Sequence, residues 1–441
     1  PASLRPGAGL AARERRSHPR GATIRTHSHH VHRAREDPMP HTSALDIETL
    51  LSADARARRK TDTDEGGAST PDIRISLSSG QPDPHSMPVE DLATAMQTVL
   101  ENDRSALLYG ARDGYAPLRQ VVADKTNSME TLRITADDVI ITTGAAQAIG
   151  LAAQAFLDRG APMLIDEASW GTLVFRAFGP HSIPVRWDED GPIIADIERA
   201  VDRLPDGERM RLFYTIPNFQ NPMGTTTTLE RRRQVLDLAR RHRFLILEDD
   251  AYFELRFAGE SLPSYYELDK ARSHVIRTGT FSKILGAGVR LGWAIAPAEI
   301  REAMMLYKFD LGSNPFMSRV VATYMQEHLE GHVEELREVY HGRRDAMLAA
   351  LEEGLGGIAT WSRPEGGFFI WVKLPDGVDS GELERATMAR GVDIWPGKAF
   401  RMDEHEDGYV RLAYSLEKSE QIAAGVAIFS EVVRELCYQR E

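Results

Sequence analysis

The chain has a single cysteine, Cys437, among 441 residues, which excludes an intramolecular disulfide and fits a reducing, cytoplasmic compartment. It has no apolar run close to the ~20 residues that a membrane-spanning helix needs, so we expect no membrane partner and no signal peptide. Basic residues are the minority, since 53 Lys and Arg against 66 Asp and Glu give a net charge of −13. Nucleic-acid binding requires a basic surface, so we expect no nucleic-acid partner.

Length and composition indicate a globular protein with more than one domain. At 441 residues the chain exceeds the size of a single hydrophobic core. Residues 1–38 are rich in Arg, Ala and His, and residues 55–71 are polar. A histidine cluster at 27–32 could bind a metal ion, but an unstructured tail is the preferred interpretation, and we expect no metal site. We therefore expect residues 1–70 to be disordered or poorly ordered, with Met39 as a candidate start and 1–38 either non-native or from an upstream start site.

Between residues 138 and 296, short β-prone runs alternate with helical patterns. This alternation predicts a mainly parallel sheet with helices on both faces. Strands are expected at 138–143, 163–166, 183–187, 211–216, 244–249, 275–280 and 291–296, with a helix at 228–243. Residues 300–355 form a long run with a helical period, which we expect to bridge the large domain and a small one, and the last ninety residues suit a small α+β domain.

The most informative segment is residues 278–293, which read TGTFSKILGAGVRLGW. Lys283 follows a hydroxyl residue, Ser282, and precedes Arg290 by seven positions, among small residues and between two β-prone runs. A lysine amine can form a Schiff base with an aldehyde. A hydroxyl and a guanidinium can bind its phosphate, while glycines allow close approach of the backbone. This combination is what an enzyme dependent on pyridoxal 5'-phosphate (PLP) requires.

The segment closely resembles the Schiff-base segment of fold-type I PLP enzymes, and especially the 2-aminoadipate aminotransferase and MocR-like branch of the class I/II aminotransferases. Further motifs occur upstream and downstream in the family's order, over roughly residues 70 to 437. The resemblance implies an α/β fold of the PLP-dependent transferase fold type I. The expected parts are an N-terminal arm with part of the small domain at 71–108, a large PLP-binding domain at 109–325 with a mainly parallel sheet, and a smaller α+β domain at 326–441.

The resemblance also assigns the residues around the cofactor ring. Asn221, in the NPMG motif at 221–224, would donate to the phenolic oxygen together with Tyr252 of the DDAY motif at 249–252. Asp249 would pair with the pyridine nitrogen and keep it protonated. Trp170 would lie flat against the ring, where this branch more often has tyrosine. We interpret Asp250 as a solvated charge at the end of a strand.

Other motifs imply the phosphate and substrate contacts. The GAAQ motif after the strand at 138–143 would hold phosphate through the backbone of Gly144, Ala145 and Ala146. Arg411 would bind the substrate α-carboxylate with its planar fork, and Gly80 and Asn221 would border the substrate. Tyr109 would reach the phosphate of a neighbouring subunit, which implies a homodimer with shared active sites. The motif SGQP at 79–82 and Ala287 depart from the family's usual GGLP and proline, so substrate specificity does not carry over.

These residues predict an aminotransferase acting on an α-amino acid and a 2-oxo acid. Lys283 would hold PLP and then move a proton between the α-carbon and the cofactor. A PLP-dependent decarboxylase, lyase or oxidase remains an alternative, because the same residues support several reactions. A MocR-like ligand-sensing regulator is the third alternative, and it would need an N-terminal winged-helix domain for which residues 1–70 lack the apolar period.

Overall fold

The computed structural model describes residues 47–52, 73–402 and 408–438. Residues 1–53 and 54–441 form separate units, and the described part of the first contains one short helix, α1 (Ile47–Leu50). The histidine cluster at 27–32 and the polar segment 55–71 lie outside the described residues. Everything below concerns the second unit.

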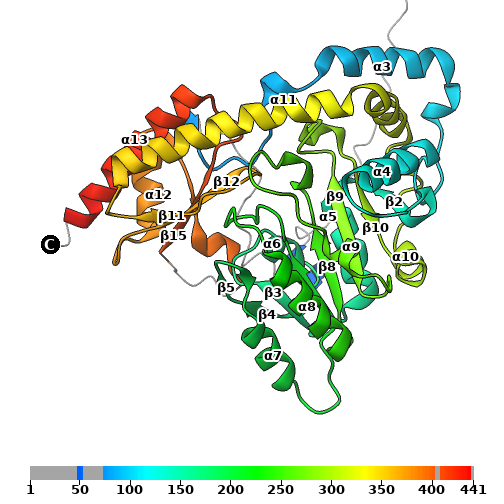
Figure 1. Ribbon diagram of the computed structural model, residues 1–441, viewed down its shortest axis with the longest axis horizontal. Coiled ribbons are helices and arrows are strands. Elements are labelled where there is room, and N and C mark those ends of the chain that lie inside the picture. The colour runs from blue at the N-terminus through cyan, green and yellow to red at the C-terminus, as the bar shows by residue number, and fades with distance from the viewer. Residues whose placement is uncertain (1–46, 53–72, 403–407, 439–441) are drawn as a thin grey trace, which may run out of the picture. The chain divides into compact units, whose positions relative to one another are not determined.

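A seven-stranded sheet with the order β2-β10-β9-β8-β7-β3-β4 forms the centre of this unit (Figure 1). Strand β10 is antiparallel to both of its neighbours, and all other pairs are parallel. The expected α/β class with a mainly parallel sheet is therefore confirmed. The strands are β2 (Val139–Thr142), β3 (Pro162–Asp166), β4 (His181–Val185), β7 (Leu212–Thr215), β8 (Leu245–Asp249), β9 (Val275–Thr280) and β10 (Gly292–Ile295).

Strands β2, β3 and β7 are apolar up to their last residue because both faces of the sheet are covered. Alternate residues enter two different cores: Ile140 packs in the core that contains α5 (Gly144–Phe156), whereas Ile141 packs in the core that contains α8 (Leu229–His242). The same alternation separates Leu247 from Ile246. Polar residues of these segments are consequently concentrated where the strands end.

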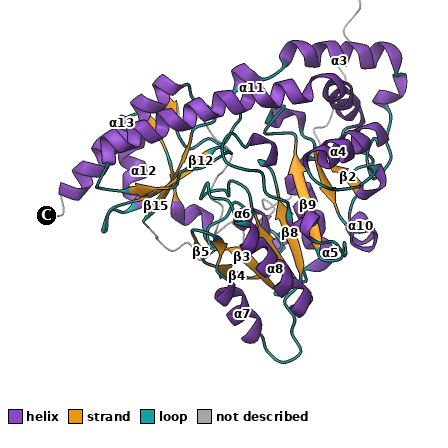
Figure 2. Cartoon of the chain, in the orientation of Figure 1, coloured by secondary structure: helices purple, strands orange, loops and turns teal. Residues whose placement is uncertain are grey.

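A second, antiparallel sheet has the order β11-β12-β15-β14 and lies beside the C-terminal helices (Figure 2). Strand β15 is an inner strand, so Arg411 on it is covered on both sides by neighbouring strands. Two short two-stranded sheets complete the strands. One of these pairs β1 (Ile75–Ser76) with β13 (Val392–Asp393), and the other pairs β5 (Trp187–Asp188) with β6 (Gly191–Pro192). The strands of the four-stranded sheet are β11 (Thr360–Trp361), β12 (Phe369–Lys373), β14 (Trp395–Pro396) and β15 (Tyr409–Ala413).

Helix α11 (Pro315–Leu355) is the longest element and packs against α13, α3 and α4. It thereby connects the helices around the large sheet with those beside the small one (Figure 1). The remaining helices are α3 (Val89–Asn102), α4 (Ala116–Met129), α6 (Gly171–Phe175), α7 (Ile194–Asp202), α9 (Tyr265–Leu268), α10 (Ala298–Met305), α12 (Ser380–Met388) and α13 (Ser419–Tyr438).

The helical run expected over 300–355 is interrupted, because the chain forms two helices, α10 and α11, with a break at 306–314. Leu311, Ser313 and Asn314 there have positive φ angles of 51°, 47° and 56°. Asn314 accepts a hydrogen bond from the backbone N–H of Met317 and so caps α11. Pro315 follows at the first helical position, where its missing N–H costs nothing. The strand expected at 183–187 is also displaced, to residues 181–185.

The expected boundary between a large domain at 109–325 and a small domain at 326–441 falls inside α11, a continuous helix. These bounds, with the arm at 71–108, stay a prediction. Among the described residues, no helix is both long and apolar enough to cross a membrane.

Candidate active site

A cavity of about 300 Å³ opens beside the C-terminal ends of the parallel strands and extends to the small sheet. This is the edge at which α/β sheets bind ligands. Twelve of the thirteen residues expected from the sequence line it: Gly80, Gly144, Ala145, Ala146, Trp170, Asn221, Asp249, Tyr252, Ser282, Lys283, Arg290 and Arg411. The exception is Tyr109. The fold thus brings together segments that are separated by more than 300 residues in the sequence.

Lys283 lies in the loop after β9, and its side chain is half-buried. Its Nζ donates a hydrogen bond of 2.9 Å to the backbone oxygen of Gly80, which belongs to the N-terminal part of the unit. Burial lowers the pKa of this amine to about 8, the charge of Arg411 acts in the same direction, and Asp249 opposes both. A lowered pKa increases the neutral fraction of the amine, which is the form that attacks an aldehyde.

Asp249 ends strand β8 and is buried. Its Oδ2 accepts a hydrogen bond of 2.7 Å from the hydroxyl of Tyr214, whereas its Oδ1 is buried and has no hydrogen-bond partner among the described residues. Burial raises the pKa of this carboxyl to about 6, and the bond from Tyr214 opposes that shift. Since buried polar atoms are normally paired, an unpaired carboxylate oxygen at a cavity wall is suited to a ligand N–H. The protonated pyridine nitrogen of PLP has this chemistry, so the residue fits the cofactor.

Asn221 and Arg411 meet on the other side of the cavity. Nη1 of Arg411 donates to Oδ1 of Asn221 at 2.9 Å, and Nη2 donates to the backbone oxygen of Ser78 at 2.6 Å. The guanidinium carbon lies 4.2 Å from the ring centre of Phe369 and 4.4 Å from that of Trp395. These aromatic faces hold the plane of the guanidinium, which stays charged although the residue is 2% exposed.

Tyr252 follows Asp249 by three residues and lines the cavity, where its hydroxyl is available as a hydrogen-bond donor. Burial raises the pKa of this phenol well above its usual value, although the charge of Arg411 opposes the shift. Tyr252 therefore stays protonated throughout the neutral range and can donate a hydrogen bond to an anionic oxygen.

The N-terminus of α5 provides an anion site at the cavity. The helix begins at Gly144, whose φ of +75° favours glycine, and Ala145 and Ala146 follow in its first turn. Gly292 of β10 packs closely against the start of this helix, because a Cβ at residue 292 would stand 2.7 Å from the backbone nitrogen of Ala145. The cradle combines free backbone N–H groups with the positive end of the helix dipole, which is the arrangement that binds phosphate.

Side chains complete this cradle. The exposed guanidinium of Arg290 lies next to Gly144, with Nη2 3.4 Å from the position of a Cβ on that glycine. Ser282 accepts a hydrogen bond of 2.9 Å from the hydroxyl of Thr280, and its own backbone N–H donates to that hydroxyl at 3.0 Å. Gln147 accepts a bond of 2.7 Å from the backbone N–H of Thr143, which fixes the start of the helix. The donor set therefore fits a phosphate dianion.

Trp170 is half-buried at the cavity wall, at the start of α6. Its backbone N–H donates to the backbone oxygen of Asn221 at 3.0 Å, so the two loops that carry these residues are joined. The stacking of its indole on a cofactor ring stays a prediction.

Tyr109 does not line the cavity of its own chain, and its side chain is 87% exposed. Leu107, Leu108 and Phe309 are also exposed, at 70%, 65% and 75%. The segments of these residues run side by side, because the backbone N–H of Gly110 donates to the oxygen of Leu311 at 2.9 Å. A cluster of exposed apolar side chains of this kind is typical of an interaction surface.

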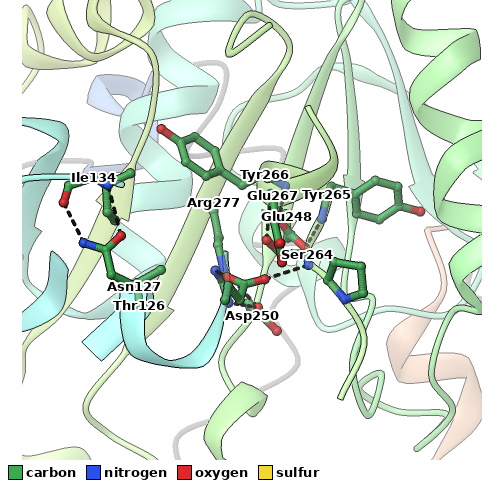
Figure 3. A network of polar contacts seen from close by, with 12 residues as sticks. Thr126, Asn127, Ile134, Glu248, Asp250, Ser264, Tyr265, Tyr266, Glu267 and Arg277 are labelled. Carbon is green, nitrogen blue, oxygen red and sulfur yellow. Dashed lines mark hydrogen bonds and ion pairs between the residues drawn. The ribbon is translucent and has the colours of Figure 1, made fainter. Parts of the chain in front are cut away.

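The interpretation of Asp250 as a solvated charge is wrong. Asp250 is 2% exposed, and its carboxylate accepts two hydrogen bonds from Arg277 and one from Asn218. The reason is local: β8 ends at Asp249, and the next side chain turns into the protein instead of the solvent. Figure 3 shows Asp250 and Arg277 within a network of polar contacts.

Sequence reasoning missed seven residues of the cavity wall: Gln81, Ile216, Ala251, Thr280, Ala287, Phe369 and Trp395. Four of them lie within the short motifs that also carry assigned residues: Gln81, Ala251, Thr280 and Ala287. Phe369 and Trp395 carried no signal, because an aromatic residue in a short strand is indistinguishable from ordinary core.

Comparisons with known proteins agree with this geometry. Residues 72–427 match the family described as aminotransferase class I and II. The chain is 33% identical over 368 residues to aromatic-amino-acid aminotransferase 1 of Thermococcus litoralis, which covers 82% of this chain and 88% of that protein. It is 34% identical over 359 residues to the 2-aminoadipate transaminase of Thermus thermophilus, covering 80% and 88%.

Solved structures show the same relationship. The multiple substrate aminotransferase of Thermococcus profundus superposes with a TM-score of 0.82 at 32% identity, covering 90% of this chain and all of that one. The α-aminoadipate aminotransferase of Thermus thermophilus, complexed with N-(5'-phosphopyridoxyl)-L-leucine, gives 0.80 at 31% identity, with coverage of 90% and 100%. The cavity, its donor set and these relatives lead to one conclusion: the chain belongs to the class I and II aminotransferases and is a PLP-dependent enzyme of fold type I.

Proposed function

We propose that this aminotransferase uses Lys283 as its cofactor lysine, Asp249 as the partner of the ring nitrogen and Arg411 as the receptor of the substrate α-carboxylate. The observation that carries the proposal is their convergence on one cavity, where Asp249 presents an unpaired oxygen and Lys283 an amine of lowered pKa. Bound PLP supplies an electron sink for the bond that breaks at the amino acid α-carbon. The α-amino acid and the 2-oxo acid are its small-molecule partners.

Each side chain then has a defined task. Lys283 Nζ removes the proton from the α-carbon and returns one on the cofactor side. Asn221 and Tyr252 donate hydrogen bonds to the phenolic oxygen, while Trp170 covers the ring. The backbone of 144–146, Ser282 and Arg290 hold the phosphate. Gly80 and its neighbours enclose the substrate from the N-terminal side, which limits the access of water.

A substrate panel tests the reaction type. The purified holoenzyme is incubated with single amino acids in the absence of a 2-oxo acid, and the products are identified by mass. Transamination predicts the 2-oxo acid and one equivalent of aminated cofactor for each site. An amine with carbon dioxide would instead indicate a decarboxylase, and ammonia release with oxygen uptake an oxidase. Binding without any product would favour a ligand-sensing regulator.

Arg411→Lys is expected to lower kcat/KM for amino acids by about 10²-fold, because lysine keeps the charge but loses the two parallel charge-assisted hydrogen bonds. The measurement compares each amino acid with its decarboxylated amine, which lacks the carboxylate and serves as the matched control. Turnover of the amine should change little. An equal loss on both compounds would show that Arg411 does not bind the carboxylate.

We further propose an isologous homodimer in which Tyr109 of each subunit reaches the phosphate of the other. The support is the exposed apolar cluster of Leu107, Leu108, Tyr109 and Phe309, together with the position of Tyr109 outside its own cavity. The single cysteine and the acidic net charge support a cytoplasmic location without a nucleic-acid partner.

Subunit complementation tests this dimer. Lys283→Ala and Tyr109→Ala proteins are each expected to be strongly impaired. After subunit exchange, each heterodimer has one site with both groups intact, so the mixture should recover about a quarter of the wild-type activity. Exchange is verified with a mass tag on one variant. No recovery despite confirmed exchange would contradict the shared site.

A further inference from the structure

Arg277, in β9, is a buried cation that does not line the cavity. Its side chain is 1% exposed, and it forms ion pairs with Glu130 at the end of α4 and with Asp250. Both Nε and Nη2 donate to Oδ2 of Asp250, at 3.0 Å and 2.7 Å, while Nη1 donates to Glu130. None of these three residues lines the cavity. A buried charge is tolerated when it is paired in this way.

The second oxygen of Asp250 extends the network toward the cofactor loop (residues 217–224). Oδ1 of Asp250 accepts a hydrogen bond of 2.7 Å from Nδ2 of Asn218. The side-chain oxygen of Asn218 accepts one of 2.7 Å from Nη2 of Arg232, and the same Nη2 donates to the backbone of Pro217 at 3.1 Å. Asn218 stands three residues before Asn221, so the carboxylate of Asp250 joins the cofactor loop to the end of β8.

Glu130 forms the other arm of the network and leads away from the cofactor. Its Oε1 accepts a hydrogen bond of 2.7 Å from the backbone N–H of Ser264, at the start of α9. The labelled residues in Figure 3 include Asp250, Ser264 and Arg277 of this network. Glu130 and Asp250 therefore share Arg277 but support different parts of the protein: the outer helix in one case, the cavity wall in the other.

The position of Asp250 in the chain gives the network its significance. The preceding residue, Asp249, lines the cavity and has one buried oxygen without a hydrogen-bond partner among the described residues, and Tyr252 lines the cavity two residues after Asp250. The backbone N–H of Asp250 also donates to the oxygen of Thr278 at 2.9 Å, which fixes this segment to β9. A small rotation of Asp250 would displace the segment with Asp249 and Tyr252 and the loop with Asn221 at the same time.

We propose that Arg277 is a positioning residue for the cofactor: its two-point hold on Asp250 fixes, as one rigid unit, the strand end that carries Asp249 and the loop that carries Asn221. This proposal rests on the assignment of those two residues to the cofactor ring. Pre-organised contacts of this kind are made precise by a second layer of hydrogen bonds. Arg277 itself touches neither cofactor nor substrate.

The test measures PLP affinity directly, by titrating cofactor-depleted protein with PLP and following absorbance, and measures unfolding by urea in parallel. Arg277→Met is expected to weaken PLP binding about tenfold, and Arg277→Lys, which keeps the charge but loses the fork, about threefold. Glu130→Gln is the matched control, because it removes the other ion pair of Arg277 and leaves the hold on Asp250. It is expected to lower the urea midpoint while PLP affinity changes less than about twofold.

A double-mutant cycle distinguishes positioning from general destabilisation. In an Asn221→Ala background, Arg277→Met should weaken PLP binding by only about threefold, because one of the two cofactor contacts that Arg277 supports is already gone. Equal effects of Arg277→Met and Glu130→Gln on PLP affinity, or an unchanged tenfold factor in the Asn221→Ala background, would overturn the proposal. If Arg277→Met does not fold, the comparison of Arg277→Lys with Glu130→Gln decides. If the assignment of Asn221 and Asp249 to the cofactor ring is wrong, the single variants Asn221→Ala and Asp249→Asn will show this separately, because their PLP affinity will be unchanged.

Discussion

Lys283→Ala is expected to lower turnover by at least about 10⁴-fold, since it removes both the covalent attachment of the cofactor and the base that moves the α-proton. Among the described residues that line the cavity, Lys283 is the only lysine. The fold should persist, because the side chain is half-buried and, among the described residues, donates one hydrogen bond, to the backbone oxygen of Gly80. Turnover and cofactor content are measured on the same preparation.

The matched control is Lys373→Ala, which removes an exposed lysine of β12 and should leave both quantities unchanged. PLP should still enter the Lys283→Ala cavity through its phosphate and ring contacts, but dilution should release it. Retention of more than about a tenth of the wild-type turnover in Lys283→Ala would contradict its role as base.

Asp249→Asn is expected to lower kcat by about 10²- to 10³-fold, with a smaller effect on the apparent KM. An amide is neutral and cannot stabilise the positive charge of the protonated ring nitrogen, so the electron sink is weakened in the transition state. The shape of the side chain is preserved, and Tyr214 can still donate to the remaining oxygen. The measurement is steady-state kinetics at saturating PLP.

Asp166→Asn is the control for the effect of neutralising a buried carboxylate that lies outside the cavity. Asp166 also ends a strand and is buried, and burial raises the pKa of its carboxyl to about 7. Its oxygens accept bonds from Trp187, Thr215, Ile216 and Gln220, and it does not line the cavity. Its substitution should lower the urea midpoint, with a loss of kcat below about tenfold. Equal losses of kcat in Asp249→Asn and Asp166→Asn would show that Asp249 has only a structural role.

The sequence predicted most of the site because the chemistry is carried by short runs at strand ends. The GAAQ motif after β2 and the TGTFSK motif at the end of β9 resemble those of the aminotransferases, and this resemblance assigned Gly144 and Lys283 to the candidate site. Parallel strands then bring these ends to one edge of the sheet. Strands β2, β3 and β7 were also found from the sequence, because uninterrupted apolar runs are typical of strands whose two faces are both covered.

Other features depend on tertiary contacts that no local pattern encodes. The pairing of Arg277 with Glu130 joins residues 147 positions apart, and Asp250 was misinterpreted because a strand-end carboxylate usually faces solvent. Trp395 and Phe369 reach the cavity because the small sheet places them against Arg411. The break between α10 and α11 had a signal, GSNP at 312–315, which the helical period of the flanking residues obscured.

The central claim is that Lys283 holds the cofactor, and borohydride reduction followed by peptide mapping tests it most directly. Reduction converts the bond between the lysine and PLP into a stable pyridoxyl-lysine, whose mass and position are read from the digest. We expect one labelled peptide, containing residues 278–290 and modified at Lys283, and no labelled peptide from the Lys283→Ala protein. A pyridoxyl group on any other lysine of the reduced wild-type enzyme would contradict the assignment of the whole site.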